Sequence, residues 1–428
     1  MSTPPLPDPE VPPPAATGTA AVTTTDEKPP PQGNTVMREI LSSGWLVTVL
    51  AVVLALVLSG VLIAAADDDV QAALKYFFSQ PMDTFAAAWS AVSSAYVALF
   101  QGAVFDTNAE TFTAAIKPLT ETMTVSIPLI LAGLGLGIGF RAGLFNIGAQ
   151  GQIILGAIFA GWVAFHLDLP AYLHLPLAML AAIVGGGLWA GIAGFLKART
   201  GAHEVIVTIM LNSIAVYLIA YLLTTPVLQN PGSTNPISPA VPKSAQYPLL
   251  LGDSFRLHAG FIVAIVAAIF VWWLMGRSTI GFKFRAVGAN PHAARTAGIS
   301  VNASYVWVML VAGALAGLAG SAQVLGTDKV LTADVAASFG FDAITVALLG
   351  RSKPLGTFFA GLLFGALRAG GFAMQARTGT PIDVVLVMQS LVVLFIAAPP
   401  LVRAVFRLPA PGPRKARAAR STTKEVAA

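Results

Sequence analysis

Uncharged hydrogen-bonding side chains gather in two short segments of otherwise apolar sequence. The segments are FRAGLFNIGAQGQ, residues 140–152, and HEVIVTIMLN, residues 203–212. Their uncharged polar residues include Asn146, Gln150, Gln152, Thr208 and Asn212. Polar groups at membrane depth are costly unless they are paired or face a cavity. In the first segment, Asn146, Gln150 and Gln152, with Arg141, could close the cytoplasmic end of a pathway, or they could cap helices and satisfy one another; the residues alone leave both interpretations open. In the second, Thr208 and Asn212 share a helix face with Glu204, whose position at a helix N-terminus is explained by the helix dipole.

No pattern typical of catalysis accompanies these segments. The chain has no cysteine, which excludes disulfides, thiol catalysis and cysteine-ligated metal, and its five histidines show no metal-ligand spacing. A phosphate-binding loop, a nucleophile elbow and a zinc-protease helix are all missing from the sequence. We therefore expect neither an enzyme nor a metal site.

The polar segment 276–302 separates two apolar stretches of spanning length. Its basic residues are Arg277, Lys283, Arg285 and Arg295. Loops rich in lysine and arginine stay on the cytoplasmic side of a membrane. Asn290 followed by Pro291 suits the start of a helix, and Gly298 suits its end. An ordered helix in such a loop suggests a docking surface for a cytoplasmic partner.

The composition is that of an integral membrane protein. Of the 428 residues, 56% are hydrophobic and 11% are charged, whereas soluble domains have about 25% charged residues. A chain of this length holds about eight to ten spans of roughly 20 residues each. No long polar stretch is left for a soluble catalytic domain, so any energy source must be another polypeptide. The net charge of +5 does not indicate nucleic-acid binding, because basic residues in a membrane protein mainly set its orientation.

Ten apolar segments are expected to cross the membrane as helices in an all-α fold. They are residues 45–66, 123–140, 153–165, 175–196, 205–223, 257–275, 303–325, 340–349, 355–367 and 382–398. Two of them, 153–165 and 340–349, are too short to cross a hydrocarbon core of about 30 Å as straight helices. Short segments in matching places of two halves point to a midplane pathway in transporters; alternatively, these two helices extend a few residues beyond their apolar segments.

The remaining segments are assigned by composition and charge. Residues 1–36, rich in proline and threonine, should be a disordered cytoplasmic tail. Residues 37–405 form the transmembrane domain, with an acidic extracytoplasmic insert at 67–117, and residues 406–428 form a basic cytoplasmic tail. With both termini inside, most lysines and arginines fall on the cytoplasmic side. The basic residues at the outer side or at outer span ends are Lys75, Lys117, Lys243, Arg256, Lys329, Arg368 and Arg377.

Several of these segments resemble the permease subunits of bacterial ATP-binding-cassette importers for branched-chain amino acids, simple sugars and nucleosides. The matching segments are residues 140–152, 203–215, 288–300 and 345–356, and they look like the nucleoside and simple-sugar branch. The similarity covers roughly residues 40–405. Two positions depart from the family pattern, which usually has Glu where Gln150 stands and Asn where His203 stands. Both substitutes can form hydrogen bonds, so the fold is not in question, although fine substrate preference is.

The resemblance implies the permease fold of these importers, in the bacterial cytoplasmic membrane, and transport of nucleosides or related sugars. It implies pairing with a second permease, identical or paralogous, and delivery of substrate by an extracytoplasmic binding protein. Separate ATPase subunits would bind ATP and magnesium, so this chain itself would need no cofactor. Because nucleosides are neutral and rich in hydroxyl groups, the expected pathway residues are Asn146, Gln150, Thr208, Asn212 and Gln323.

In this family the cytoplasmic segment near residues 288–300 would be the coupling helix, set into a cleft of the ATPase. Its expected residues are Asn290, Pro291, Ala293, Ala294, Arg295 and Gly298. Together with Ala297, the alanines would give a small-residue face for close fit, and Arg295 would be available for a carboxylate. An ordinary interfacial loop is the alternative.

Two other classes of protein compete with the permease. A secondary transporter would need intramembrane carboxylates, and the sequence offers few: Asp342, Glu204 and Asp383. A passive channel or scaffold would have no use for the coupling-type loop. Within the permease family, monosaccharides and branched-chain amino acids compete with nucleosides. The sequence shows no obvious intramembrane cation for an amino-acid carboxylate, which weakly favours an uncharged ligand.

Overall fold

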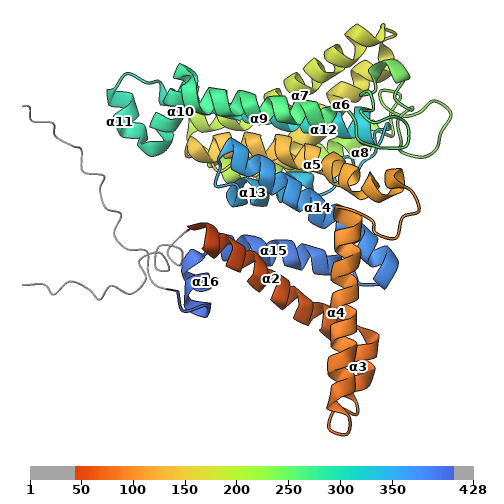
Figure 1. Cartoon of the computed structure of the whole chain (residues 1–428). Coiled ribbons are helices and arrows are strands. Elements are labelled where there is room, and N and C mark those ends of the chain that lie inside the picture. Colours follow the sequence, from red (N-terminus) through yellow and green to blue (C-terminus); the bar gives the residue numbers. More distant parts are fainter. Residues whose placement is uncertain (1–43, 409–428) are drawn as a thin grey trace, which may run out of the picture. The chain divides into compact units, whose positions relative to one another are not determined.

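The computed structural model describes residues 44–408, and all the regular elements in this range are helical. The expectations of a disordered tail at 1–36 and, from residue 409 on, of a basic cytoplasmic tail concern residues outside this range. Figure 1 shows the described helices, most of which run side by side with their axes in a common direction.

Each of the ten expected segments coincides with a helix. Eight helices in the described range are long and apolar enough to cross a membrane. They are α2 (Gly44–Ala66), α5 (Phe112–Arg141), α6 (Ala149–His166), α7 (Ala171–Thr200), α8 (Glu204–Leu222), α9 (Gly260–Arg277), α12 (Val301–Ala322), which continues into a π-helical turn (Gln323–Thr327), and α14 (Pro354–Thr378). A ninth span is formed if α15 (Asp383–Ala397) and α16 (Pro399–Val405), bent by 94°, are counted together.

The two segments expected to be short differ in the structure. The helix α13 (Phe339–Leu349) has 11 residues and is short, as expected. The helix α6 has 18 residues, because it begins at Ala149 and takes Gln150 and Gln152 into its first turn. The limit at residue 153 was therefore wrong for α6: these glutamines find hydrogen-bond partners inside the protein and do not end the helix.

The outer limit expected for the span at 355–367 is also wrong. The helix α14 continues to Thr378, so Arg368 lies within it and not beyond its end. A charged residue does not end an apolar helix when a neighbouring helix supplies its counter-ion, and Asp342 of α13 is the counter-ion of Arg368.

The acidic insert at 67–117 is largely helical. It contains α3 (Asp68–Leu74), α4 (Pro81–Ala103) and the first turns of α5. Asp67 starts α3 by accepting a hydrogen bond from the backbone N–H of Val70 at 3.0 Å. We call α3 and α4 together the α3–α4 hairpin.

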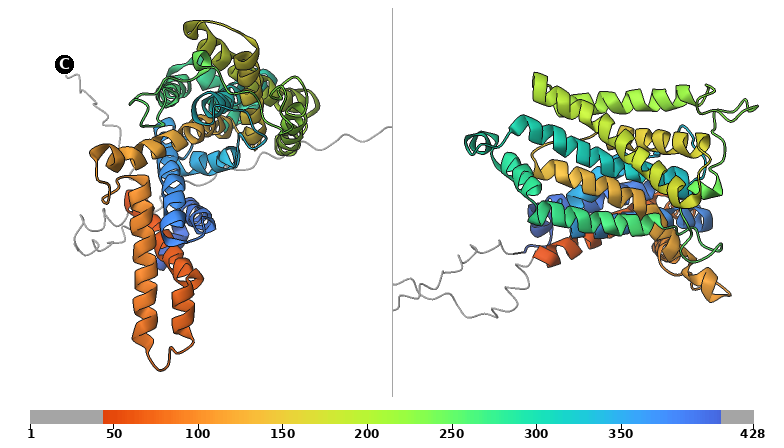
Figure 2. Two further views of the ribbon diagram at one scale, coloured as in Figure 1. Left: turned by 90° about the vertical axis from the view of Figure 1, so that its right-hand side faces the viewer. Right: turned by 90° about the horizontal axis from the view of Figure 1, so that it is seen from above.

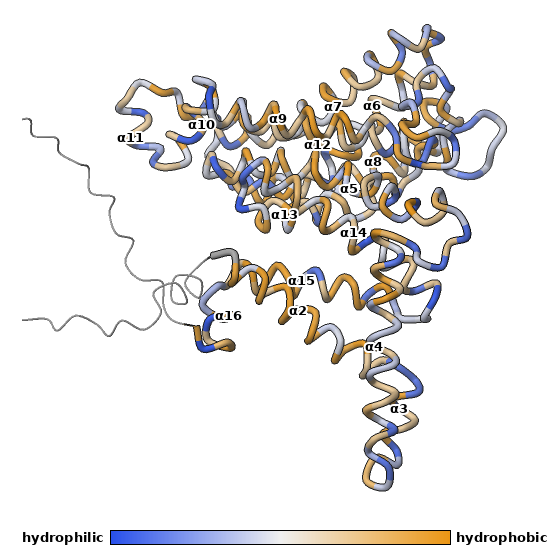
Figure 3. Tube along the Cα trace, in the orientation of Figure 1, coloured by the Kyte–Doolittle hydropathy of each residue, from blue (hydrophilic) through white to orange (hydrophobic). Residues whose placement is uncertain are grey.

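Small residues allow close packing of the bundle helices. A Cβ atom added to Gly186 of α7 would lie 2.4 Å from the carbonyl oxygen of Gly313 in α12, so glycine is required where these two helices touch. This is the packing expected between membrane helices, where small residues let backbones approach. The hydropathy colouring in Figure 3 shows apolar residues along the bundle helices and many of the hydrophilic residues near their ends.

The two ends of the bundle differ. One end carries α10 (Thr279–Ala289) and α11 (Pro291–Thr296), together with the start of α2 and with α16. The other end carries residues 223–259, which connect α8 to α9 and include the short 3-10 helix Lys243–Ala245, and the α3–α4 hairpin. The right-hand view of Figure 2 shows the same separation from above.

Candidate functional site

An unwound segment, residues 142–148, connects α5 to α6 and runs along α8. Gly143 has φ of 74°, a left-handed conformation that ends α5. The backbone N–H of Phe145 donates to Glu204 Oε1 at 3.3 Å. Further along α8, the side chain of Asn212 donates to the carbonyl oxygen of Ile147 and accepts from the N–H of Gly151, both at 2.9 Å.

These contacts explain the spacing of the polar residues in α8. Glu204, Thr208 and Asn212 stand four residues apart and therefore share one face of the helix, and that face meets the unwound backbone. Thr208 Oγ1 takes part through a longer hydrogen bond, 3.4 Å, from the N–H of Ile147. Buried backbone groups need such partners when no helix supplies them, so these side chains hold the unwound segment in place.

Glu204 carries a second connection. Its Oε2 atom lies 2.6 Å from the Nζ atom of Lys197 in α7, and only 9% of the Glu204 side chain is exposed. The carboxylate is therefore paired with a cation as well as bonded to the unwound segment. Its part in this network accounts for a charged group at the start of a membrane helix.

Asn146 organises the start of α6. Its Oδ1 atom accepts from the N–H of Gly148 at 2.8 Å and from Gln152 Nε2 at 3.1 Å, and the Asn146 side chain is fully buried. The arrangement closes a turn just before the helix. The side chains of Asn146, Thr208 and Asn212 thus form hydrogen bonds within the protein, to backbone groups or to one another. Their contact with a substrate stays a prediction.

Gln150 joins two helices that begin inside the protein. Its Oε1 atom accepts from the N–H of Gly340 in the first turn of α13 at 3.0 Å, and its Nε2 atom donates to the carbonyl oxygen of Ala337 at 2.5 Å. A Cβ atom on Gly340 would lie 2.3 Å from the Gln150 backbone nitrogen, so the two backbones nearly touch. We call this meeting of the N-terminal ends of α6 and α13 the half-helix junction.

An ion pair adjoins the half-helix junction. Arg368 Nη1 donates to Asp342 Oδ2 at 2.8 Å and to Ser338 Oγ at 2.9 Å. The guanidinium carbon also lies 4.3 Å from the centre of the Phe339 ring, a cation–π distance. About one fifth of each charged side chain is exposed, so the pair is largely enclosed.

Sequence reasoning missed this pair. It had placed Arg368 at an outer span end and had found no intramembrane cation, and the structure corrects both points. The sequence had weakly favoured an uncharged ligand because no cation was found for a ligand carboxylate. Arg368 is such a cation, but Asp342 neutralises its charge. The available signal was one acid in one apolar segment and one base in the next, which is a reason to expect pairing.

Gln323 stands apart from the half-helix junction. It lies where α12 passes into the π-helical turn, is 6% exposed, and its side chain forms no hydrogen bond to any described residue. The preceding turn of α12 packs against α6, since a Cβ atom on Gly320 would lie 2.1 Å from the Ile153 carbonyl oxygen. A substrate contact at Gln323 remains a prediction.

The basic segment contains a short capped helix, α11. Asn290 caps it by accepting from the N–H groups of His292 and Ala293 at 2.9 and 3.1 Å, and Pro291 occupies its first position. The chain leaves the helix through Gly298, whose φ is 79°. The expected start and end of this helix are confirmed.

One residue expected on the outer face of α11 faces inward. Ala294 is 4% exposed and packs against Val287 and Val301 of the same chain. Ala293 and Arg295 are exposed and remain candidates for contact with a partner. Ala294 instead fixes α11 to α10 and α12.

The basic segment touches the unwound segment directly. A Cβ atom on Gly288 in α10 would lie 2.2 Å from the carbonyl oxygen of Arg141, and one on Gly143 would lie 3.3 Å from the Gly288 Cα atom. These are backbone contacts with no room for a side chain. The helix α10 therefore rests directly on the segment that leads into α6.

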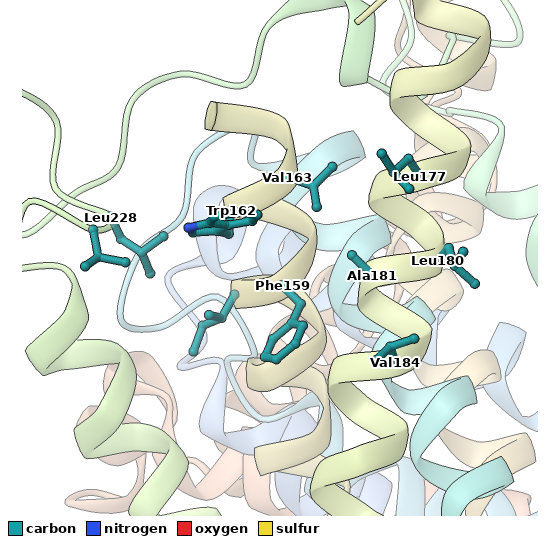
Figure 4. Close-up of a pocket in the computed structure, with 10 residues that line it drawn as sticks. Phe159, Trp162, Val163, Leu177, Leu180, Ala181, Val184 and Leu228 are labelled. Carbon is teal, nitrogen blue, oxygen red and sulfur yellow. The ribbon is translucent and has the colours of Figure 1, made fainter. Parts of the chain in front are cut away.

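An apolar groove lies on α6 and α7, beyond the half-helix junction. Figure 4 shows its lining, which includes Phe159, Trp162, Leu177 and Leu180. It involves the second half of α6, whereas Gln150 lies in the first turn of this helix. The lining is almost purely hydrocarbon and offers nothing to recognise hydroxyl groups, so this groove is not the candidate site.

Comparison with known proteins places the chain in a family. The family described as branched-chain amino acid transport system / permease component matches residues 119–397. The guanosine ABC transporter permease protein NupP of Bacillus subtilis is 40% identical over 315 residues, covering 73% of this chain and 88% of NupP. The glucose ABC transporter permease protein TsgB13 of Haloferax volcanii is 40% identical over 287 residues, covering 65% of this chain and 75% of TsgB13.

A third relative is the nucleoside ABC transporter permease protein NupB of Lactococcus lactis. It is 33% identical over 317 residues, covering 72% of this chain and 86% of NupB. No solved structure matches the sequence. With the match to the family and with these relatives aligned over most of its length, the chain belongs to the branched-chain amino acid transport system permease family.

Proposed function

We propose that this multi-pass membrane protein imports nucleosides as the permease subunit of an ATP-driven transporter. The observation that carries the substrate class is the similarity to a guanosine permease and a nucleoside permease over nearly three quarters of the chain. The geometry agrees with a neutral, hydroxyl-rich solute, because the polar groups at the half-helix junction carry no net charge: Gln150 is neutral and Asp342 neutralises Arg368.

The proposal includes the partners that such a permease needs. Two ATPase subunits bind ATP and magnesium and meet the exposed face of α11, where Ala293 and Arg295 are accessible. A second permease, identical or paralogous, completes the membrane part, and an extracytoplasmic binding protein delivers the substrate. The protein then resides in a bacterial cytoplasmic membrane with both termini inside.

The contacts suggest how ATP drives transport. Closure of the ATPase subunits moves α11 and α10, and the Gly143–Gly288 contact passes this movement to the unwound segment. That segment leads into α6 and so to Gln150, which holds the N-terminal end of α13. Breaking and remaking the half-helix junction would switch access from one side of the membrane to the other. A solute shifts this equilibrium only through its differential affinity for the two states.

A monosaccharide is the second candidate substrate. The glucose permease TsgB13 is as similar in identity as NupP, although the alignment covers less of each chain. A sugar and a nucleoside share hydroxyl groups but differ in the aromatic base, so the two proposals separate in a competition experiment.

The experiment is uptake by cells that lack this chain, before and after it is restored. Radiolabelled guanosine, uridine, glucose and leucine are compared, with the proton gradient collapsed and ATP maintained. Loss of nucleoside uptake that is restored with the chain and survives without the gradient is expected. A defect confined to glucose or leucine would change the substrate, and uptake that vanishes with the gradient would overturn the ATP-driven mechanism.

A further inference from the structure

The helix α4 is long but does not run with the bundle. It has 23 residues, yet it is not among the helices apolar enough to cross a membrane. Figures 1 and 2 show its axis lying across the direction of the bundle helices. Its C-terminal end lies at the end of the bundle away from α10 and α11, where Thr122 Oγ1 donates to the carbonyl oxygen of Ala103 at 2.6 Å.

The two faces of α4 differ in chemistry. Met82, Phe85 and Trp89 project from one side and are 73%, 61% and 76% exposed. A second stripe, roughly 80–180° around the helix from these residues, carries the exposed Asp83, Ser90 and Ser94, and Thr84, Ala95 and Ala98 beyond it are buried. No lysine or arginine occurs in α4. A long helix with an aromatic face and a polar face fits the surface of a bilayer and not its interior.

The aromatic face continues into the turn between α3 and α4. Phe78 is 99% exposed, and the Phe77 ring lies 5.7 Å from that of Phe78 and 6.1 Å from that of Phe85. Such a cluster is costly in water. Aromatic side chains are favoured at the boundary between hydrocarbon and headgroups. The neighbouring helix α2, long and apolar enough to cross a membrane, ends just before α3.

The hairpin starts directly from a membrane span. The span α2 ends at Ala66, and Asp67 begins α3. Further back, the Tyr96 hydroxyl donates to the carbonyl oxygen of Leu56, and a Cβ atom on Gly60 would lie 3.2 Å from Val92. The two helices are thus tied together near these residues.

An apolar groove of about 560 Å³ separates α2 from α4. Val53, Val57 and Val61 line it from α2, and Phe85 and Trp89 line it from α4. These valines belong to a helix that is long and apolar enough to cross a membrane. Phe85 and Trp89 of α4 therefore face the same apolar groove as a candidate membrane span, whereas Ser90 and Ser94 do not line it.

We infer that the α3–α4 hairpin is an interfacial anchor, lying in the bilayer leaflet on the side away from α10 and α11. Phe78, Phe85 and Trp89 insert among the lipids, and an acyl chain occupies the groove between α2 and α4. The hairpin fixes the depth and tilt of α2, to which Tyr96 joins it, and the bond from Thr122 to Ala103 connects α4 to α5 of the bundle.

The absence of cysteine from the chain makes single-cysteine labelling of the full-length protein straightforward. Phe85→Cys and Trp89→Cys test the aromatic face, and Ser94→Cys is the matched control on the opposite face. Each variant is spin-labelled in vesicles of phosphatidylethanolamine and phosphatidylglycerol and exposed to oxygen, which dissolves in lipid, or to a water-soluble nickel chelate. Oxygen should dominate at Phe85 and Trp89 by several-fold, and nickel at Ser94.

Two outcomes would overturn the inference. Nickel access at Phe85 and Trp89 equal to that at Ser94 would put the hairpin in water. Exclusion of both reagents at Phe85 and Trp89 would mean that protein covers this face, as a second copy of the chain would. A label-free measurement guards against misfolded variants: quenching by lipids brominated in the acyl chain is compared in the wild type and Trp89→Phe. The fluorescence that is lost on replacing Trp89 must include a component that brominated lipids quench. If it includes none, lipid contact of Trp89 is refuted.

Discussion

Gln150 and Gly340 stand 190 residues apart in sequence and are joined by one hydrogen bond, from the Gly340 N–H to the Gln150 side chain, at 3.0 Å. The same side-chain amide donates a hydrogen bond to the carbonyl oxygen of Ala337. One neutral side chain thereby fixes the start of α13 against the start of α6. A donor and an acceptor are both needed, and the side-chain amide of Gln150 supplies one of each.

Replacement of Gln150 tests this relationship. Gln150→Leu leaves the buried Gly340 N–H without a partner, at a cost of about 1–3 kcal/mol, and also frees the part-buried carbonyl oxygen of Ala337. We expect a lower melting temperature of the purified protein and loss of substrate uptake. Gln150→Glu, which keeps an acceptor for Gly340 but loses the donor to Ala337, should retain intermediate uptake. Full uptake by Gln150→Leu would show that the half-helix junction is dispensable.

The contact between α10 and the unwound segment should be intolerant of a side chain. In Gly288→Ala the added Cβ atom would lie 2.2 Å from the Arg141 carbonyl oxygen and force α10 away. Uptake should fall severely at an unchanged amount of protein in the membrane. Gly276→Ala is the matched control, because nothing lies within 4 Å of its Cβ position. Equal uptake by the two variants would remove this contact from the transmission path.

The Arg368–Asp342 pair should show strong coupling. Removal of one partner leaves a charge largely enclosed by protein, whereas removal of both leaves none. Asp342→Asn and Arg368→Met should each be destabilising, and the double variant should be less so than the sum, with a coupling energy of about 1–3 kcal/mol. Denaturation of the purified protein in detergent measures all four forms. Additive effects would show that the two charges act independently.

His258 should make stability depend on pH. Burial, with smaller effects from Arg256 and Lys329, lowers its pKa from 6.5 to about 4. Since the unfolded chain binds the proton more readily, stability is complete above pH 6.5 and declines as pH falls toward 4, by about 3 kcal/mol in all. The melting temperature of wild type should therefore drop more steeply over this range than that of His258→Gln. Parallel curves would contradict neutral burial of this ring.

The exposed face of α11 should govern docking of the proposed ATPase. Because Ala294 is buried, the informative substitution is Arg295→Glu combined with Ala293→Trp. We expect insertion into the membrane to continue while uptake and copurification with the ATPase are lost. Arg199→Glu, an equal change of charge at an exposed residue ending α7, should retain both. Copurification by the α11 variant would place docking elsewhere.

The sequence was informative wherever local chemistry decides structure. Apolar runs located the membrane helices, and Asn290, Pro291 and Gly298 located α11, because caps act on their own neighbours. The start of α6 was misplaced for the opposite reason: Gln150 and Gln152 look like the end of a span until their distant partners are known. Arg368 was misread in the same way, since Asp342 lies on another helix. The crosswise course of α4 depends on its packing, which no periodicity reveals.

The half-helix junction also has an electrical consequence for the cell. The N-terminal end of a helix carries a positive partial charge, and α6 and α13 direct theirs at the same point. Positive helix ends are barriers to cations in membrane pores; Gln150 adds no charge to this field, and Asp342 in the first turn of α13 is paired with Arg368. A neutral solute is indifferent to it, whereas a proton or a sodium ion is repelled. In the proposed route past this junction, a neutral solute would therefore pass while the cations that carry the membrane potential are held back.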